Sequence, residues 1–386
     1  MNTTNHTTEN SKPFEGLLVI SIEQAVAAPL CSCQLAEGGA RVIKVERAEG
    51  DFARNYDTAV KGESSYFVWA NHGKQSLSLN FKDPHGAKLL HNMLKKADIL
   101  IQNLAPGAMQ RAGFGSDELR QQYPQLITCD ISGYGDSGIY RDMKAYDFLV
   151  QCESGLVAIN GAPEAYGRIG VSVCDIGAGM NALIGIQNAL LSRAKTGQGS
   201  GVKVSLFDTA ADWMSVPYLH SVYAGKAPKR VGLHHPSIAP YGGYTTADEE
   251  ILAISIQNER EWIRFCAEVL EHADLASDSR FNNASARVEN RHILDDYIKQ
   301  VFSQKSREQL EEILKSAAIA YGAVNSVESF SQHPQLRRRK VTLESGEETD
   351  IIDSPIRHST KPDDENFGAV PSLGQHTELI KQEFSE

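Results

Sequence analysis

The chain has 386 residues, of which 41% are hydrophobic and 23% charged, and its formal net charge at pH 7 is −11. This length predicts two domains, or one large domain with an insertion, in a globular protein of ordinary composition. The negative charge argues against general binding to nucleic acids or anionic membranes, but it is compatible with a local basic pocket for an anionic ligand.

Residues 1–13 are polar and lack the apolar core of a secretory signal, so we expect a disordered N-terminal tail. No apolar run approaches the length of a membrane span. Only Cys31 and Cys33 of the six cysteines are close in sequence, and no second pair or histidine cluster completes a metal site. We therefore expect reduced thiols, a cytoplasmic location and no bound metal.

The chain opens with the pattern of a β-α-β unit. Residues 17–22 read as a buried strand, a turn of small residues follows at 23–28, and a helix is expected from Pro29 to residue 36. A second strand at 41–45 implies parallel strands with a right-handed crossover. The turn after the first strand lacks G-x-G-x-x-G, which disfavours a nicotinamide or flavin enzyme.

The alternation of strands and helices continues to about residue 222, which predicts an α/β fold. Further strands are expected at 76–80, 99–102, 126–131 and 202–206, and helices at 83–97, 116–123, 148–157 and 208–222. The segment 51–71 is expected to be irregular and aromatic. Two strands lead into the glycine-containing turns 103–107 and 132–135, at the sheet edge where open α/β folds bind ligands.

The pattern changes near residue 224. A loop-rich stretch at 226–244 precedes a strand at 251–256 and helices at 259–270, 287–301 and 306–317. We interpret 14–224 as a large domain and 225–325 as a smaller α+β domain. Short strands and turns at 324–330, 336–342 and 351–357, then a helix from residue 372, return residues 326–386 to the large domain.

Residues 170–174 read as a short extended run before a long apolar helix that closes at Gly197. Asp175 stands at the junction, where it is either a helix N-cap or a nucleophile. In the second interpretation, Gly177 and Gly179 leave room for a substrate. Cys174 is an alternative nucleophile, although a cysteine in this setting is more often a small buried hydrophobe.

Basic residues recur at or just beyond the ends of predicted strands, at Arg47, Lys82, Arg111 and Lys144. Each one alone fits a solvated surface base, but their recurrence at one sheet edge suits a ligand that carries phosphates. His234 and His235 are candidate general bases or carboxylate partners, and equally they fit loop residues without a chemical role.

Seven short motifs occur in a fixed order: 23–29 (EQAVAAP), 41–47 (RVIKVER), 102–107 (QNLAPG), 132–135 (SGYG), 145–147 (AYD), 173–180 (VCDIGAGM) and 372–377 (SLGQHT). Together they resemble the class III CoA-transferases, which include formyl-CoA and carnitine CoA-transferases and also α-methylacyl-CoA racemases. The resemblance runs from Phe14 nearly to the C-terminus.

The resemblance implies that Asp175 attacks an acyl-CoA thioester, giving a mixed anhydride and then an aspartyl-CoA thioester, from which CoA passes to an acceptor carboxylate. Backbone N–H groups near Gly177 or on a glycine loop would hold the oxyanion. A helix N-terminus should make the carboxylate less nucleophilic, and we expect desolvation to offset this. The implied CoA contacts are Gln24, Ala25, Arg47, Leu79, Lys82, Asn103, Leu104, Arg111, Lys144 and Tyr146.

The resemblance also implies a Rossmann-like large domain, a small domain and an intertwined homodimer, with CoA as a substrate and no permanently bound cofactor. In some relatives a glycine-rich loop of the small domain covers the nucleophile, and its nearest counterpart here is Tyr241–Tyr244. Racemases of this family carry a histidine where this chain has Tyr146, so a transferase is favoured. A racemase or a non-catalytic CoA-binding protein are the alternatives.

Residues 23–29, 51–54 and 257–262 are most similar to members that use succinyl-CoA as donor and a small dicarboxylate as acceptor. Itaconate, mesaconate and citramalate are examples. A second carboxylate on the acceptor would need a cation, for which Arg54, His234 and His235 are the candidates.

Overall fold

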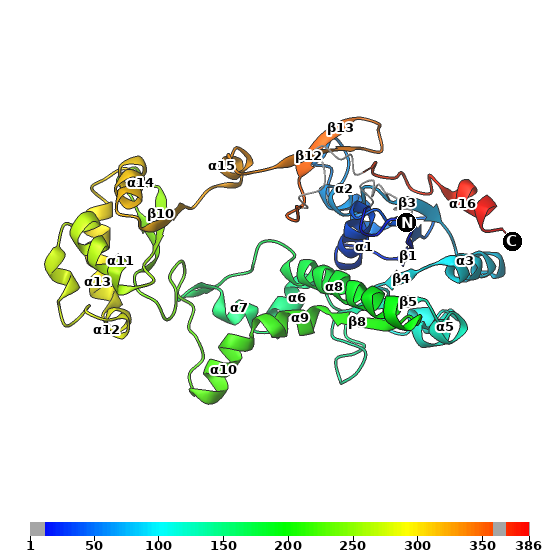
Figure 1. The fold of residues 1–386 in the computed structure, drawn as a ribbon, viewed down its shortest axis with the longest axis horizontal. Coiled ribbons are helices and arrows are strands. Elements are labelled where there is room, and N and C mark those ends of the chain that lie inside the picture. The colour runs from blue at the N-terminus through cyan, green and yellow to red at the C-terminus, as the bar shows by residue number, and fades with distance from the viewer. Residues whose placement is uncertain (1–11, 358–367, 386) are drawn as a thin grey trace, which may run out of the picture. The chain divides into compact units, whose positions relative to one another are not determined.

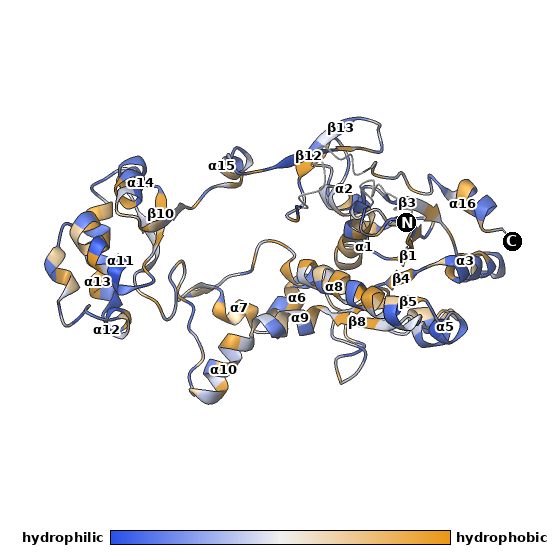
Figure 2. Cartoon of the chain, in the orientation of Figure 1, coloured by the Kyte–Doolittle hydropathy of each residue, from blue (hydrophilic) through white to orange (hydrophobic). Residues whose placement is uncertain are grey.

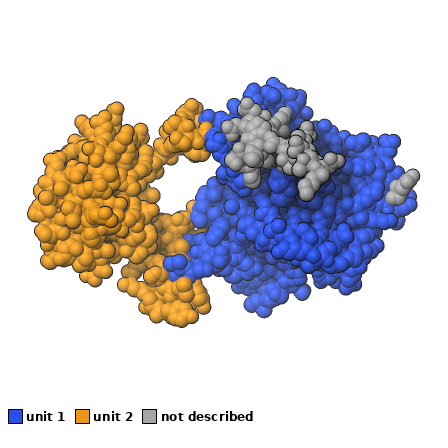
Figure 3. All heavy atoms as spheres, in the orientation of Figure 1, with its two compact units in different colours: residues 1–156, 169–216, 337–386 blue, residues 157–168, 217–336 orange. Residues whose placement is uncertain are grey.

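The computed structural model of the protein describes residues 12–357 and 368–385. The chain forms two compact units, which Figure 3 shows in different colours. Unit 1 contains residues 1–156, 169–216 and 337–386, and unit 2 contains residues 157–168 and 217–336. The tail expected at residues 1–13 lies, except for its last two residues, outside the described part of the chain.

A six-stranded sheet forms the centre of unit 1, and Figure 1 labels five of its strands. Its strand order is β3-β2-β1-β4-β5-β8. All neighbouring strands are parallel. The strands are β1 (Leu18–Ile22), β2 (Arg41–Glu46), β3 (Gln75–Ser78), β4 (Ile99–Gln102), β5 (Ile127–Ser132) and β8 (Gly201–Ser205). The strand order reverses between β1 and β4, which is where sheets of this kind open a crevice at their carboxyl edge. The predicted α/β class with a Rossmann-like sheet is confirmed.

Helices cover both faces of this sheet, because successive residues of each strand point to opposite sides. Val19 of β1 belongs to a core shared with α1 (Ala27–Glu37), α6 (Asp147–Glu153), α8 (Val173–Thr196) and α9 (Leu206–Trp213). Ile20 belongs to the opposite core, with α3 (Pro84–Lys96), α4 (Ala108–Arg111), α5 (Ser116–Gln122) and α16 (Thr377–Glu383). Both faces of the sheet are therefore buried from solvent.

Helix α8 has 24 residues and packs along α1. Hydrophobic residues occur along its length (Figure 2), and the buried Ala178, Ala182 and Ile186 repeat every four residues, which places them on one face. The helix ends as predicted at Gly197, whose φ of 71° is left-handed and suits glycine. Its first turn is thereby held rigidly at the edge of the sheet.

Unit 2 is built on a three-stranded antiparallel sheet of order β11-β10-β9. Its strands are β9 (Tyr241–Thr245), β10 (Ile251–Ser255) and β11 (Ala320–Ala323). Trp262, Phe265 and Phe302 are fully buried in its core. The remaining elements are the hairpin β6 (Gly161–Ala162) and β7 (Ala165–Tyr166), η2 (Phe265–Val269), η3 (Ala273–Ala276), α11 (Glu259–Arg264), α12 (Ala284–Glu289), α13 (Arg291–Phe302), α14 (Arg307–Ser316) and α15 (Val327–Ser331).

A hairpin of β12 (Arg338–Thr342) and β13 (Glu348–Ile352) belongs to unit 1. Val341 and Leu343 of this hairpin region form a small core with Phe67 and Val68 of α2 (Ser65–Asn71). The C-terminal part of the chain is thus packed against a segment near the N-terminus.

Several predicted elements differ from the structure. The segment 51–71, expected to be irregular, contains η1 (Phe52–Asn55) and α2, because the Asp51 side chain caps the first turn. The helix expected at 148–157 is two helices, α6 and α7 (Leu156–Ile159), since Gly155 adopts a left-handed φ of 85° between them. The helix expected at 208–222 is likewise α9 followed by α10 (Ser215–Tyr223), and the segment 324–330 contains α15 rather than a strand.

Across residues 12–357 and 368–385, no helix combines the length and the apolar character needed to cross a membrane.

Candidate active site

Asp175 lies in the first turn of α8, at the third helical position. The extended run expected at 170–174 is wrong, because residues 170 and 171 form bends and the helix begins at Val173. Ser172 occupies the N-cap position, and its side chain makes no capping hydrogen bond. The interpretation of Asp175 as the helix cap is therefore wrong, and another residue has to satisfy the free N–H groups of the first turn.

That residue is Asp147, the first residue of α6, which is buried. Its Oδ1 accepts hydrogen bonds from the N–H of Cys174 at 2.7 Å and from the N–H of Asp175 at 3.3 Å. Its Oδ2 accepts a hydrogen bond from Nε2 of Gln151 at 2.7 Å, and Gln151 in turn accepts the N–H of Ile169 at 3.0 Å. Asp147 thus caps α8 from α6. The sequence motif at 145–147 contains this acid, but no sequence signal gave it a role.

The pKa of Asp175 is raised from 3.8 to about 7, first by burial and second by the negative charge of Asp147. The N-terminal N–H groups of α8, which carry the positive end of the helix dipole, are bonded to Asp147. The dipole therefore does not lower the pKa of Asp175 enough to cancel the effect of burial. The pKa of the neighbouring Cys174 thiol rises to about 12, through burial and then the charges of Asp147 and Asp175. A raised pKa keeps the Cys174 thiol neutral at pH 7, which disfavours the alternative of Cys174 as the nucleophile.

Gly177 and Gly179 serve helix packing rather than substrate access, which corrects the expectation from sequence. A Cβ atom at Gly177 would overlap the Trp213 ring and lie 2.7 Å from Cγ2 of Thr209, and one at Gly179 would lie 2.6 Å from the carbonyl oxygen of Ala27. The two glycines let α8 approach α9 and α1 closely.

The oxyanion site expected near Gly177 is also wrong. Gly177 lies inside α8, where its N–H belongs to the helical hydrogen-bond ladder. Cys174 and Asp175 are the second and third residues of the helix, so their N–H groups have no partner within it. Both N–H groups already donate to Asp147. Donors for a developing oxyanion must come from another part of the site.

A cleft of about 400 Å³ opens at the carboxyl ends of β1 to β4 in unit 1. Five of the predicted CoA contacts line it, namely Gln24, Arg47, Leu79, Lys82 and Leu104. Ala25 and Asn103 lie beside it, because Ala25 follows Gln24 and the Asn103 side chain hydrogen-bonds the Gln24 backbone in both directions. The side chain of Arg47 is 60% exposed at this cleft. Seven of the ten predicted CoA contacts therefore lie at or beside this cleft.

Three predicted contacts do not line this cleft. Arg111 ends α4 and donates a hydrogen bond to the carbonyl oxygen of Pro106 at 3.3 Å. Lys144 and Tyr146 belong to the exposed segment before α6, where Tyr146 is 65% exposed.

Tyr56 is a neighbour of Asp175 that the sequence did not predict. Burial, followed by the charges of Asp51 and Asp175, raises the pKa of Tyr56 to about 12, so its hydroxyl remains a donor at neutral pH.

Arg54 is engaged inside unit 1 and does not offer a free cation, unlike the expectation from sequence. Its guanidinium pairs with Glu46 at 2.9 Å and with Glu344 at 2.5 Å, and donates to the carbonyl oxygen of Pro371. The guanidinium also lies 3.8 Å from the centre of the Phe67 ring. These contacts indicate a structural residue.

The two candidate histidines belong to unit 2. The ring of His235 stacks on Tyr241, and burial lowers the pKa of His234. Tyr241–Tyr244, the counterpart expected for a covering loop, forms most of β9 and pairs with β10. This stretch is therefore a strand, and its Gly242 provides space for the His234 ring, which a Cβ atom there would overlap.

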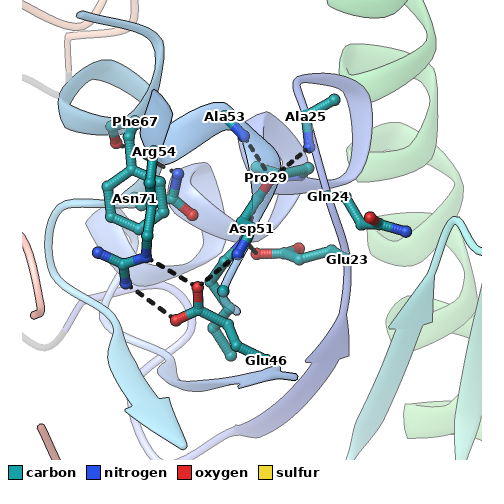
Figure 4. A network of polar contacts seen from close by, with 12 residues as sticks. Glu23, Gln24, Ala25, Pro29, Glu46, Asp51, Ala53, Arg54, Phe67 and Asn71 are labelled. Atoms are coloured by element: carbon teal, nitrogen blue, oxygen red, sulfur yellow. Dashed lines mark hydrogen bonds and ion pairs between the residues drawn. The ribbon is translucent and has the colours of Figure 1, made fainter. Parts of the chain in front are cut away.

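A buried network of charges adjoins the cleft, which its members Glu23 and Asp51 line, and Figure 4 shows part of this network. Glu23 contacts Lys74 at 2.8 Å and Lys44 at 3.5 Å, and Lys44 also contacts Asp51 at 2.8 Å. Burial opposes the ionisation of Glu23, but the charges of the two lysines outweigh it and lower the pKa of Glu23. Sequence reasoning missed this network, because its members are spread over residues 23 to 74.

One group of side chains has the residue types of a metal site: Cys33, Glu37 and His72, whose donor atoms lie within 4.8 Å of one another. Burial lowers the pKa of His72, yet its contacts with Cys33 and Glu37 outweigh burial and raise that pKa to about 10. Nε2 of His72 lies 3.0 Å from Oε1 of Glu37, which forms an ion pair when the imidazole is protonated. Arg339 also bonds to Glu37. The chemistry of this group therefore favours a structural ion cluster.

Unit 1 contains both an acid of raised pKa, Asp175, and a cleft at the carboxyl edge of its parallel sheet. Known proteins are similar to this chain across its length. A family model described as CoA-transferase family III matches residues 14–377. The chain belongs to CoA-transferase family III. Enzymes of this class III family act on acyl-CoA thioesters and carboxylic acids, and the predicted enzyme class is confirmed.

Named relatives cover nearly the whole transferase. The acetyl-CoA:oxalate CoA-transferase of Acetobacter aceti is 31% identical over 376 residues, which are 97% of this chain and 96% of the relative. The succinate–glutarate CoA-transferase of Agrobacterium fabrum is 30% identical over 384 residues, 96% and 95% of the two chains. The succinyl-CoA:mesaconate CoA-transferase of Haloarcula marismortui is 27% identical over 385 residues, 96% of each.

Solved structures agree with this membership. A CaiB/BaiF family protein from Brucella suis superimposes with a TM-score of 0.82 and 31% identity, over 97% of this transferase and 100% of that chain. Rv3272 from M. tuberculosis superimposes with a TM-score of 0.84 over 96% and 99% of the two chains, and its 23% identity supports the fold alone.

Proposed function

We propose that this transferase moves CoA from succinyl-CoA to a small dicarboxylate such as itaconate, mesaconate or citramalate, with Asp175 as the covalent carrier. The observation that carries the proposal is the carboxyl group of Asp175, which is partly buried beside the carboxylate of Asp147 and has a pKa raised to about 7. A carboxylate in this setting is a stronger nucleophile than a solvated one.

Four steps account for the transfer. An oxygen of Asp175 bonds to the thioester carbon of succinyl-CoA, and the C–S bond breaks to release the CoA thiolate. The thiolate attacks the aspartyl carbonyl of the resulting anhydride and displaces succinate, leaving an aspartyl-CoA thioester. The acceptor carboxylate displaces CoA thiolate from Asp175, and the thiolate then attacks the acceptor carbonyl of the second anhydride. This last step restores the Asp175 carboxylate, and no water takes part.

The electrostatics of the site favour these intermediates. A pKa raised from 3.8 to about 7 means that the site prefers a neutral over a charged group at Asp175 by on the order of 4 kcal/mol. The aspartyl anhydride and the aspartyl thioester are neutral. Acylation therefore relieves both the burial of charge and the repulsion from Asp147.

Binding of CoA in the cleft at the ends of β1 to β4 is the second part of the proposal. The cleft contains the exposed guanidinium of Arg47 and the amine of Lys82, which suit phosphate groups. The apolar Leu79 and Leu104 line the same cleft and suit the uncharged arm of CoA. The names of three relatives include a dicarboxylate: oxalate, glutarate and mesaconate.

The proposal includes an intertwined homodimer in the cytoplasm. Helix α10 contains no buried residue and exposes the large apolar side chains of Val216, Tyr218, Leu219, Val222 and Tyr223. Exposed apolar side chains gathered on one helix suit a subunit interface. All six cysteines are free thiols, which suits a reducing compartment.

A transfer assay tests the substrate class. Purified enzyme is given succinyl-CoA and each of a panel of mono- and dicarboxylic acids, and acyl-CoA products are measured by liquid chromatography. We expect C4 and C5 dicarboxylates to be converted and Asp175→Asn to be inactive. Turnover of monocarboxylates alone, or full activity of Asp175→Asn, would contradict the proposal.

A further inference from the structure

The turn that follows β1 has an unusual backbone conformation. Ala25 has a φ of 64°, in the left-handed region that residues with a Cβ atom rarely adopt. The preceding Gln24 lines the cleft at the carboxyl edge of the sheet. Among the described residues, the side-chain amide of Gln24 has no hydrogen-bond partner in the chain, and Figure 4 shows it pointing away from the buried charges. Something must hold this turn in place.

Two side chains from other elements hold it. Oδ1 of Asp51 accepts the N–H of Ala25 at 3.1 Å. Oδ1 of Asn103 accepts the N–H of Gln24 at 2.9 Å, and its Nδ2 donates to the carbonyl oxygen of Gln24 at 2.8 Å. The turn is thus clamped from the ends of β2 and β4, the strands on either side of β1.

Asp51 is itself fixed by three further contacts. Its Oδ1 also accepts the N–H of Ala53 at 2.9 Å, and its Oδ2 accepts a hydrogen bond from Nζ of the fully buried Lys44 at 2.8 Å. Its own N–H donates to Glu46 at 3.1 Å, and Glu46 is paired with Arg54. Figure 4 shows Asp51 between Ala25, Ala53 and Glu46.

We propose that Asp51 is a positioning residue for the transfer reaction, which holds Ala25 in its left-handed conformation and so aims Gln24 into the cleft. The inference rests on the proposed binding of CoA there. A hydrogen bond to an ionised carboxylate is among the stronger ones in proteins and can maintain a backbone conformation that alanine alone avoids. Without it, the turn relaxes to a negative φ and the cleft changes shape.

The test measures the dissociation constant of CoA by titration calorimetry, together with the thermal unfolding of each variant. We expect Asp51→Ala to weaken CoA binding about tenfold. Asp51→Asn retains an oxygen acceptor for Ala25, so its affinity should stay within about threefold of the wild type. Glu344→Gln, a change at the outer end of the same network, is the matched control and should leave the affinity unchanged.

A rescue variant separates positioning from general stability. Glycine adopts a positive φ without strain, so Ala25→Gly added to Asp51→Ala should regain at least about threefold in affinity, whereas a merely structural role of Asp51 predicts no recovery. Should Asp51→Ala not fold, the double variant Asp51→Ala/Lys44→Met also removes the buried amine that Asp51 contacts, and it gives the same comparison.

Wild-type affinity in Asp51→Ala, or no recovery on adding Ala25→Gly, would overturn the inference. Failure of the proposed function looks different. In that case Arg47→Ala, at the exposed rim of the cleft, would bind CoA as tightly as the wild type, or the wild type would not bind CoA at all.

Discussion

Asp147 accepts the backbone N–H of Asp175 at 3.3 Å and so places a second carboxylate at the start of α8, next to the proposed nucleophile. This relationship has two effects. The hydrogen bonds to Asp147 fix the first turn of the helix, and the negative charge of Asp147 raises the pKa of Asp175. A variant that removes the charge of Asp147 but keeps a hydrogen-bond acceptor therefore separates helix capping from the effect on the pKa of Asp175.

Asp147→Asn keeps an oxygen acceptor for the first turn but removes the negative charge. We expect the pKa of Asp175 to fall, so the acid limb of the pH profile of kcat/KM for the acyl-CoA donor should move to lower pH, by on the order of one unit. The plateau rate should also fall, because a less basic carboxylate is a poorer nucleophile. An acid limb at the wild-type pH would show that Asp147 does not tune Asp175.

Asp175→Asn should stabilise the protein at alkaline pH. The folded pKa of about 7 lies above the unfolded value of 3.8, so between these values the unfolded wild type loses a proton that the folded state retains, and wild-type stability falls as pH rises. Asp175→Asn has no titrating group at this position, so its stability does not fall in this way as pH rises. Its advantage in free energy of unfolding should be near zero at pH 4 and reach on the order of 4 kcal/mol above pH 8.

Urea unfolding of both proteins from pH 4 to pH 9 measures this difference. Asp212→Asn, a change at an exposed aspartate of α9, is the control and should give a difference that does not vary with pH in this way. A variant advantage that is constant or that shrinks as pH rises would contradict the raised pKa.

Gly177→Ala should destabilise the fold. The added Cβ atom overlaps the Trp213 ring and lies 2.7 Å from Thr209, and such overpacking costs about 1–3 kcal/mol, more than the gain in helix propensity. Gly170→Ala, where nothing lies within 4 Å of the new atom, is the matched control. Equal thermal stability of the two variants would disprove close packing of α8 on α9 at this position.

Arg54→Met tests whether Arg54 is structural or binds the acceptor. The side chain is 11% exposed, and it neutralises the fully buried carboxylate of Glu46. Its loss should lower the free energy of unfolding by about 3–5 kcal/mol, with the KM values of mono- and dicarboxylate acceptors changed equally. A rise confined to the KM of dicarboxylates would instead restore Arg54 as the site of the second carboxylate.

Local patterns in the sequence predicted most of unit 1. The apolar runs of β1, β2 and β4 and the proline and glycine that bound the helices act over a few residues, so they are visible in the sequence. Parallel strands then bring their carboxyl ends to one edge, which is why Gln24, Arg47 and Leu104 could be placed together at the cleft.

The contacts that the sequence did not predict are long-range. The hydrogen bond from Cys174 to Asp147 spans 27 residues and that from Ala25 to Asp51 spans 26, and no local rule pairs them. The burial that places Gly177 against α9 and Arg54 between two glutamates is likewise a property of the assembled unit, since each residue alone fits an exposed or functional position equally well.

The most direct test of the central claim is mass spectrometry of the intact enzyme after incubation with succinyl-CoA, with the wild type beside Asp175→Ala. The account predicts an adduct of the mass of CoA on the wild type alone, converted by hydroxylamine to a hydroxamate that peptide mapping places on Asp175. The same adduct on the variant, or transfer activity without any adduct on the wild type, would contradict a covalent aspartyl carrier.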